Sequence, residues 1–228
     1  MYEAVHAHPD GEATVARLAM TASEYGYEGV VVRNHGDSPA SYDPGAVAET
    51  YGVDVVPGVE VRAADPSRAS GFVGNHRDRH AIVVVHGGDP AINRFAVEQP
   101  AVDVLAHPTR ERGFDHVLAR EAARNGVHVE LSLRPLVTEQ GGSRVGAIER
   151  LRRLADILQQ YDTPFVVSVD PRSHLDLRSP RDLAALGETV GLSGETVREG
   201  LAEWGRLAER NRERAADRFV EPGVYREE

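Results

Sequence analysis

The amino-acid sequence predicts a single α/β domain, a distorted TIM barrel of the (β/α)7 type. Seven short apolar runs alternate with amphipathic segments of helical period, and no change of composition divides the chain. An open, doubly wound sheet is the alternative arrangement of the same elements. We expect the barrel to cover residues 1–212, and residues 213–228 to form a polar C-terminal tail that is partly disordered.

One stretch shows the repeating unit of this fold most clearly. An apolar run ends at His107-Pro108, where proline stops the strand by withholding a backbone donor. Asp115 can cap the following helix through its side-chain oxygen, and Asn125-Gly126 can close that helix in the left-handed conformation. A second apolar run follows. Strand, helix and strand at this spacing predict a βαβ crossover, which requires a parallel sheet.

The predicted strands are rich in β-branched residues and comprise residues 3–5, 29–33, 54–61, 81–85, 102–106, 127–131 and 165–169. The predicted helices comprise residues 12–25, 45–51, 90–97, 115–124, 148–160, 180–189 and a final helix that begins after Ser193. In the fourth helix we expect Val117, Leu118 and Ala122 on the inner side. Segments 62–79 and 134–146 contain several glycines and are expected to be loops, and the chain is expected to fray from Arg210 onward.

All 26 basic residues are arginines, and 36 acidic residues give the chain a formal net charge of −10. This composition is typical of proteins from salt-loving archaea, although a GC-rich genome also favours arginine codons. A negative chain ordinarily disfavours a nucleic-acid partner. In molar salt, however, the Debye length falls to roughly 3 Å, so the net charge no longer governs the encounter with RNA. Binding then depends on the local geometry of the arginines, and an RNA partner is not excluded. Without lysine or cysteine the chain cannot form a Walker-A loop, a lysine Schiff base or a cysteine zinc site.

The N-terminus lacks the basic region and apolar core of a signal peptide. No later run of residues is long and apolar enough to span a bilayer. We therefore expect a cytoplasmic protein without a membrane partner.

Histidine and carboxylate side chains stand at the C-terminal ends of the predicted strands, where parallel α/β folds place their functional sites. In His6-Ala7-His8 an extended backbone would point both imidazoles to one side, as chelation requires. A single histidine at a strand end is usually a hydrogen-bonding loop residue, but so many at one edge favour a metal pocket. Imidazole and carboxylate groups suit zinc or manganese. The candidate ligands are His6, His8, His35, Glu60, His86, His107 and Asp170.

Two motifs carry a resemblance to a known family. Residues 113–119 (GFDHVLA) with 132–136 (SLRPL) form the first motif, and residues 179–187 (SPRDLAALG) form the second. In this order they resemble protein component 3 of ribonuclease P, the p30-type subunit family shared by archaea and eukaryotes. The resemblance implies a subunit of an endoribonuclease that removes the 5′ leader from precursor tRNA, with RNA carrying the catalysis and no cofactor required.

The same resemblance implies partners and contact residues. The implied partners are ribonuclease P RNA, protein component 2 and the other protein subunits, with precursor tRNA met indirectly. Arg134 and Arg181 stand within the two motifs and are the first candidates for RNA binding, because a planar guanidinium can hold two phosphate oxygens. Arg110 and Arg112, in the loop after His107, are further candidates.

The histidine pattern is also similar to the polymerase-and-histidinol-phosphatase superfamily of metal-dependent phosphoesterases, which has a distorted (β/α)7 barrel. That superfamily places an Asp-x-His motif after its seventh strand. Here Asp170 and His174 are two residues too far apart for the motif, which counts against His174 as a ligand. Because the histidine pattern is otherwise similar, a free-standing metal-dependent phosphoesterase is the alternative function.

Overall fold

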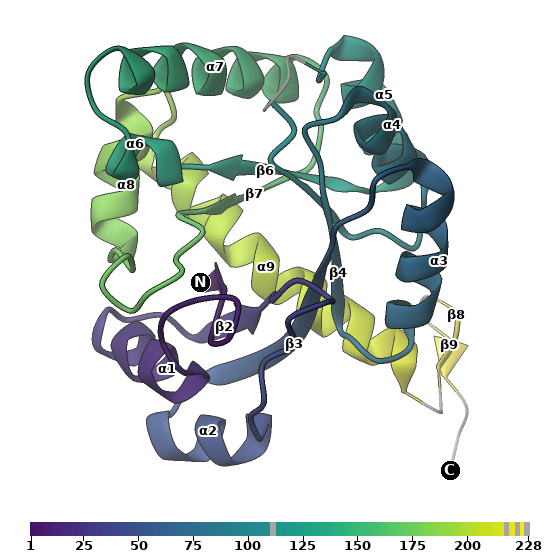
Figure 1. The fold of residues 1–228 in the computed structure, drawn as a ribbon, viewed down its shortest axis with the longest axis vertical. Coiled ribbons are helices and arrows are strands. Elements are labelled where there is room, and N and C mark those ends of the chain that lie inside the picture. Colours follow the sequence, from purple (N-terminus) through teal and green to yellow (C-terminus); the bar gives the residue numbers. More distant parts are fainter. Residues whose placement is uncertain (110–112, 217–218, 222–223, 226–228) are drawn as a thin grey trace.

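Seven parallel strands form the frame of the protein, in a computed structural model that describes residues 1–109, 113–216, 219–221 and 224–225. The strands pair in sequence order from β1 to β7 and curve into a barrel that stays open between β1 and β7 (Figure 1). This confirms the predicted barrel, because a doubly wound sheet would change its strand order at a switch point. The strands are β1 (Tyr2–Val5), β2 (Gly29–Val32), β3 (Asp54–Val61), β4 (Ile82–His86), β5 (Val104–Ala106), β6 (His128–Ser132) and β7 (Phe165–Ser168).

Most of the helices begin at a side-chain cap. Asp-Pro pairs start three of them, since the aspartate accepts a hydrogen bond from the first turn and proline already has helical φ at the first position. The helices are α1 (Val15–Glu24), α2 (Pro44–Tyr51), α3 (Pro66–Arg77), α4 (Pro90–Glu98), α5 (His116–Asn125), α6 (Arg134–Thr138), α7 (Gly141–Gln160), α8 (Pro180–Glu188) and α9 (Gly194–Ala215). A short antiparallel pair, β8 (Phe219–Glu221) and β9 (Val224–Tyr225), follows.

Two segments expected to be loops are helical. Helix α3 occupies much of segment 62–79: Asp65 caps it, and Ala69 and Val73 are buried one turn apart. Its glycines lower the helix propensity but do not prevent a capped, packed helix from forming. Helix α6 and the first turns of α7 occupy segment 134–146 for a similar reason, because Leu136 and Ala147 are buried against the barrel.

Two smaller expectations are also wrong. Val117 is 48% exposed, because the inner face of α5 is formed by Leu118, Ala119 and Ala122. Helix α9 does not fray at Arg210 but continues to Ala215. The predicted domain boundary at residue 212 thus falls inside α9. The disorder predicted for the tail concerns residues that lie in part outside the described ranges, and it stays a prediction.

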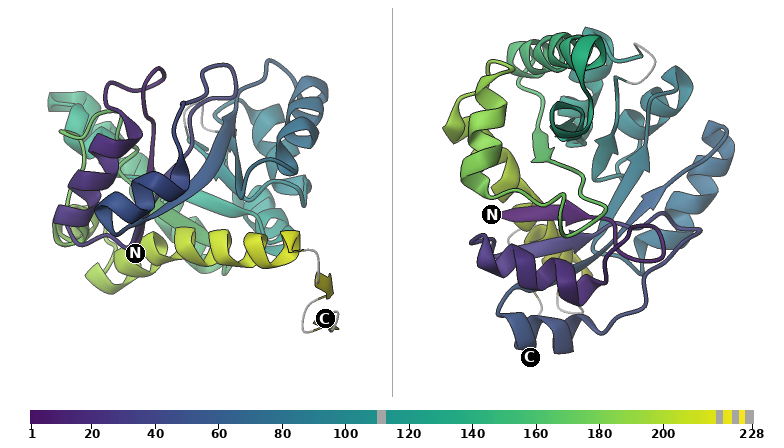
Figure 2. Two further views of the ribbon diagram at one scale, coloured as in Figure 1. Left: turned by 90° about the horizontal axis from the view of Figure 1, so that it is seen from below. Right: turned by 60° about the vertical axis from the view of Figure 1, so that its left-hand side comes forward.

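The barrel interior has a lower apolar layer and an upper polar layer. Alternate strand residues face inward, and the lower layer consists of Ala4, Val31, Val56, Ile82, Val84, Val104, Ala106 and Val166. Helix α9 closes this end of the barrel, and its Trp204 is fully buried and donates its indole N–H to the carbonyl of Val167 at 2.9 Å. Figure 2 shows α9 along one end of the barrel, with long loops at the opposite end. In the described part of the chain, no helix combines the length and apolar character needed to cross a membrane.

Candidate metal centre and barrel mouth

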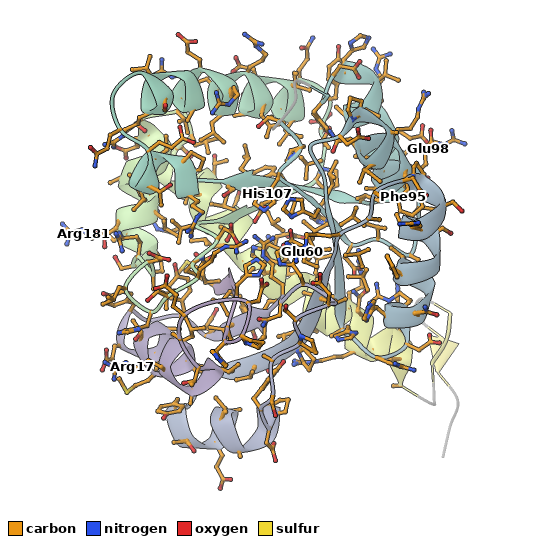
Figure 3. All side chains as sticks on the ribbon, in the orientation of Figure 1. Arg17, Glu60, Phe95, Glu98, His107 and Arg181 are labelled. Atoms are coloured by element: carbon orange, nitrogen blue, oxygen red, sulfur yellow. The ribbon has the colours of Figure 1, made fainter. Side chains whose placement is uncertain are left out.

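The polar layer stands directly on the apolar one, at the C-terminal ends of the strands. Arg33 follows inward-facing Val31 by two residues, and Glu60 lies at an even spacing from inward-facing Val56 on β3. The same alternation brings His6, His86, Glu130 and Asp170 to the upper interior. Figure 3 shows Glu60 and His107 in the middle of the barrel. The site is therefore built on rigid strand ends.

Asp10 joins two of the histidines. Its Oδ2 lies 2.7 Å from Nδ1 of His6 and 2.7 Å from Nδ1 of His35, and it accepts the His35 backbone N–H at 3.0 Å. Burial would raise the pKa of the Asp10 carboxyl, but the hydrogen bonds from His6 and from the His35 backbone lower it. Sequence reasoning missed Asp10. A carboxylate two residues beyond a His-x-His pair was the available signal.

His6 is enclosed by carboxylates. Its Nε2 lies 3.1 Å from Asp170 Oδ1 and 3.4 Å from Glu60 Oε2, and its side chain is fully buried. Burial would lower the pKa of His6, but the hydrogen bonds to Asp10, Asp170 and Glu60 raise it to about 10. The neighbouring carboxylates therefore favour the protonated form of His6, although its Nε2 atom makes no hydrogen bond in the described structure.

Glu60 is the centre of a second group of contacting side chains. Its Oε1 lies 3.4 Å from Nε2 of His35 and 3.7 Å from Nε2 of His107, and it contacts Nδ1 of His86. Burial opposes ionisation of Glu60, but Arg33 and hydrogen bonds from His35, His6 and His86 hold its pKa well below the usual value. Burial lowers the pKa of His107 to about 4, so its imidazole is neutral at pH 7 and its nitrogen lone pair is available.

Arg33 is the largest feature that sequence reasoning missed. Its fully buried guanidinium lies 2.8 Å from Glu130 Oε1 and 2.9 Å from Asp170 Oδ1, through the same Nη2 atom. It also stands 5.7 Å from the centroid of the Trp204 ring beneath it. Burial would lower the pKa of Arg33, but the surrounding carboxylates Glu130, Glu60 and Asp170 raise it. The sequence signal for Arg33 was a charged residue that ends an apolar strand at a position facing the barrel interior.

Glu130 was missed as well, because it lies within a predicted strand rather than at its end. Burial raises its pKa to about 7, in spite of the neighbouring Arg33. The backbone at the mouth is strained, since His107 and Asp170 have φ values of 52° and 49°. Residues other than glycine seldom adopt this left-handed region, and such strain concentrates at functional sites.

The structure brings together six of the seven predicted ligands: His6, His35, Glu60, His86, His107 and Asp170. His8 is exposed and takes no part in the cluster, because β1 ends at Val5 and the chain turns back so that Gly11 N–H bonds the Ala7 carbonyl at 2.8 Å. Among the described residues, two sets of three donor groups could each hold a metal ion: His6, Asp10 and His35, and also His35, Glu60 and His86. His174 belongs to neither set.

A cavity of about 600 Å³ opens above the cluster. His86 and His107 lie at its base, and arginines from four segments line it: Arg62, Arg134, Arg150 and Arg172. Arg134 donates a 2.6 Å hydrogen bond to the carbonyl of Asp170, so it braces the mouth as well as facing it. Arg181 is exposed on α8 and points away from the barrel (Figure 3). Arg110 and Arg112 lie outside the described residues.

Comparison with known proteins identifies the family. The ribonuclease P subunit p30 family model matches residues 1–216. Ribonuclease P protein component 3 of Haloarcula marismortui is 60% identical over 229 residues, which cover 100% of this chain and 97% of that protein. The protein of the same name from Methanosarcina mazei is 36% identical over 200 residues, which cover 87% of this chain and 83% of that protein.

Two solved structures share the fold. A chain from the cryo-EM structure of archaeal ribonuclease P with mature tRNA superposes with a TM-score of 0.84 and 24% identity, covering 98% of this chain and 96% of that one. Histidinol phosphate phosphatase from Lactococcus lactis, complexed with zinc, L-histidinol and phosphate, superposes with a TM-score of 0.55 and 11% identity. The match covers 85% of this chain and 97% of that one. The family match over residues 1–216 and the similar relatives lead to one conclusion: this chain belongs to the ribonuclease P subunit p30 family.

Proposed function

We propose that this chain is a non-catalytic protein subunit of ribonuclease P, which supports removal of the 5′ leader from precursor tRNA while RNA carries the catalysis. The observation that carries this proposal is the alignment along the whole chain with relatives named ribonuclease P protein component 3. The proposed partners are the ribonuclease P RNA, protein component 2 and other protein subunits, with precursor tRNA met indirectly. The proposed location is the cytoplasm, and the role requires no cofactor.

The state of the barrel interior supports a non-catalytic role. Asp170 and Glu130 face the guanidinium of Arg33, and His6 is held between Asp10 and Asp170. Groups that pair with one another in this way are less available to position a water molecule or to transfer a proton. The cluster therefore resembles an inherited site that now contributes mainly to the interior of the barrel.

The arginines supply the proposed RNA contacts. Arg181 is the best placed of the original candidates, because it is exposed at the start of α8 and no hydrogen bond or ion pair engages its side chain in the described structure. Arg150 and Arg172 extend this set at the mouth. Since the whole chain is negative, RNA binding would depend on such local groups and on salt.

Co-purification tests the proposal. The tagged chain would be isolated from its native cell in high salt, and the RNA that accompanies it would be sequenced. We expect ribonuclease P RNA to be enriched over total RNA, and its enrichment to fall for a chain with Arg181, Arg150 and Arg172 all changed to alanine. A preparation without this RNA, or with RNA in proportion to cellular abundance, would contradict a subunit role.

A metal-dependent phosphoesterase is the second candidate, because two sets of possible ligands meet at the mouth. Zinc or manganese would bind there and activate a water molecule. Elemental analysis together with a phosphodiesterase assay in manganese tests this function. Turnover that His35→Ala and His86→Ala abolish would favour it, whereas bound metal without turnover would leave the subunit role in first place.

A further inference from the structure

We infer that the barrel mouth and an adjoining groove bind two consecutive unpaired nucleotides of RNA, one in each hollow, with the phosphate between them held by Arg150. The inference rests on the proposed subunit role, because it takes RNA as the partner. It requires no ion in the cluster beneath the mouth. Four features of this edge of the barrel support it: two adjoining hollows, arginines without partners, buried polar atoms without partners, and a shape that excludes a duplex.

The two hollows meet at a ridge on helix α7, which lies beside α5 and α6 (Figure 1). The mouth cavity of about 600 Å³ extends to one side of this ridge. A groove of about 220 Å³ extends to the other side, where Arg153 and Phe114 line it. Arg150 and Leu154 are one helical turn apart and form the ridge, because both of them line both hollows, as does Thr109. A ligand that crosses the ridge therefore occupies the cavity and the groove together.

Three arginines of the two hollows are available to an anion. In the described part of the chain, no hydrogen bond or ion pair engages the side chain of Arg150, Arg153 or Arg172. The other arginines of the mouth, Arg62 and Arg134, already have partners at 3.0 Å and 2.6 Å. A guanidinium can hold two phosphate oxygens at once. A phosphate bound to Arg150 on the ridge has one nucleotide on each side, and Arg172 can hold the phosphate beyond the nucleotide in the mouth.

Acidic side chains restrict where a phosphate can lie. The carboxylates of Glu130 and Asp170 are 1% and 2% exposed, and they form the floor of the mouth cavity, where they face Arg33. One further acidic residue lines each hollow, Glu139 in the mouth and Glu149 in the groove. Repulsion from the floor keeps a phosphate at the rim beside the available arginines. The deep part of the cavity is left for an uncharged group.

The floor of the mouth cavity offers polar atoms that lack a partner. Glu130 and Ser132 are two residues apart on β6, so both side chains point into the barrel. Neither Oε2 of Glu130 nor Oγ of Ser132 makes a hydrogen bond in the described structure, although both atoms are buried. Buried polar atoms without partners destabilise a protein. A nucleobase and its ribose carry uncharged hydrogen-bonding groups that would satisfy these atoms.

The dimensions of the site select unpaired RNA. Pockets of roughly 300–1,000 Å³ enclose small organic ligands, so the mouth cavity accommodates one nucleotide but not a helix. Unpaired bases can turn out of an RNA loop and stack on aromatic rings or guanidinium planes, and Phe114 and Arg153 offer such surfaces in the groove. A duplex keeps its bases inside and would reach only the arginines at the rim. An acidic peptide would suit these arginines but not the acidic floor.

Photo-crosslinking of the assembled particle tests the site. Ribonuclease P RNA, the other protein subunits and the full-length chain would be combined in molar potassium chloride and irradiated with ultraviolet light. Mass spectrometry would locate the nucleotides attached to the chain, and base-specific chemical modification would show which unpaired bases the chain protects. We expect adducts on the segments that contain Phe114 and Ser132, formed by two consecutive unpaired nucleotides.

Variants separate the phosphate contacts from the pocket. Arg150→Ala combined with Arg172→Ala should lower the salt slope of RNA binding by about two units, one for each phosphate contact. Ser132→Leu keeps both arginines but places an apolar side chain at the floor. It should expose the protected base while changing the slope by less than about one unit. The matched control combines Arg124→Ala with Arg198→Ala, two exposed arginines outside both hollows, and should bind like the wild type.

Each other outcome has a separate meaning. Adducts confined to other segments, or protection of paired bases only, would overturn the inference while leaving the subunit role intact, as long as the RNA co-purifies with the chain. A segment of another protein subunit crosslinked at the mouth in place of RNA would also overturn it. Equal salt slopes for the double arginine variant and its control, with circular dichroism showing folded chains, would exclude the phosphate contacts. Loss of co-purification with the RNA would overturn the subunit role itself.

Discussion

The hydroxyl of Ser168 donates a 2.5 Å hydrogen bond to the carboxylate of Glu3, across the open edge of the barrel. Glu3 lies on β1 and Ser168 ends β7, and these two strands are not paired in the sheet. The same carboxylate accepts the backbone N–H groups of Ala4 at 3.0 Å and Val169 at 3.3 Å. One buried side chain thus replaces part of the missing strand pairing.

This position gives stability a distinct pH dependence. Burial raises the pKa of Glu3 to about 8, above its value in the unfolded chain of about 4.3. Its contribution to stability is therefore complete below the unfolded value and is lost as pH rises through about 8. Glu3→Gln, which cannot ionise, should gain stability relative to the wild type as pH rises from about 4.3 to about 8, and the difference should then stay level. Thermal midpoints of both proteins would show this, and a constant difference across the range would refute it.

Arg33 should be necessary for stability. Arg33→Met removes the cation that Glu130 and Asp170 face, and breaking such a buried pair costs about 3–5 kcal/mol. Adding Glu130→Gln should recover part of this loss, because one buried charge then disappears. Urea unfolding measures the free energies, with Arg68→Ala on the exposed face of α3 as the control. If Arg33→Met by itself were as stable as Arg68→Ala, that result would contradict the buried charge network.

The two arginines of the family motifs should behave differently. Arg181→Ala should leave the thermal midpoint unchanged while lowering the salt slope of RNA binding by about one unit. Arg134→Ala should also destabilise the fold by about 1 kcal/mol, because its guanidinium donates to the Asp170 carbonyl. RNA binding measured over a series of potassium chloride concentrations separates the two effects. Identical slopes for Arg181→Ala and wild type would exclude that residue as a phosphate contact.

Salt should stabilise the whole chain. With 36 acidic residues against 26 arginines, self-repulsion should lower the thermal midpoint as potassium chloride falls from molar to millimolar concentration. Differential scanning calorimetry over this range gives the answer. A midpoint independent of salt would show that the acidic surface is not an adaptation to concentrated salt.

The sequence predicted secondary structure best where the spacing of apolar residues and the capping residues indicate the same element. All seven strands and every capped helix except α3 were predicted, because apolar runs and Asp, Ser or Pro signals mark them. Helix α3 was missed because its glycines outweighed Asp65-Pro66 in the prediction. The extension of α9 past Arg210 was missed because long-range contacts hold it: Arg210 and Asn211 both bond Asp103 at the base of β5.

The candidate site was predictable only in part. Residues at strand ends were found because parallel strands present their C-terminal ends at one face. His8 was wrongly included because the chain turns where an extended backbone was assumed. Arg33 and Glu130 were missed because a single sequence does not reveal that a charge inside a strand faces a carboxylate or guanidinium from another strand. Such pairing depends on the closure of the barrel.

Reconstitution tests the central claim most directly. Ribonuclease P RNA and the other protein subunits would be assembled with and without this chain, and the rate of 5′-leader removal from precursor tRNA would be measured in molar salt. We predict faster cleavage with the chain present, no cleavage by the chain alone, and full activity with His35→Ala if that variant folds. Equal rates with and without the chain, or leader removal by the chain in the absence of the RNA, would contradict its role as a non-catalytic subunit.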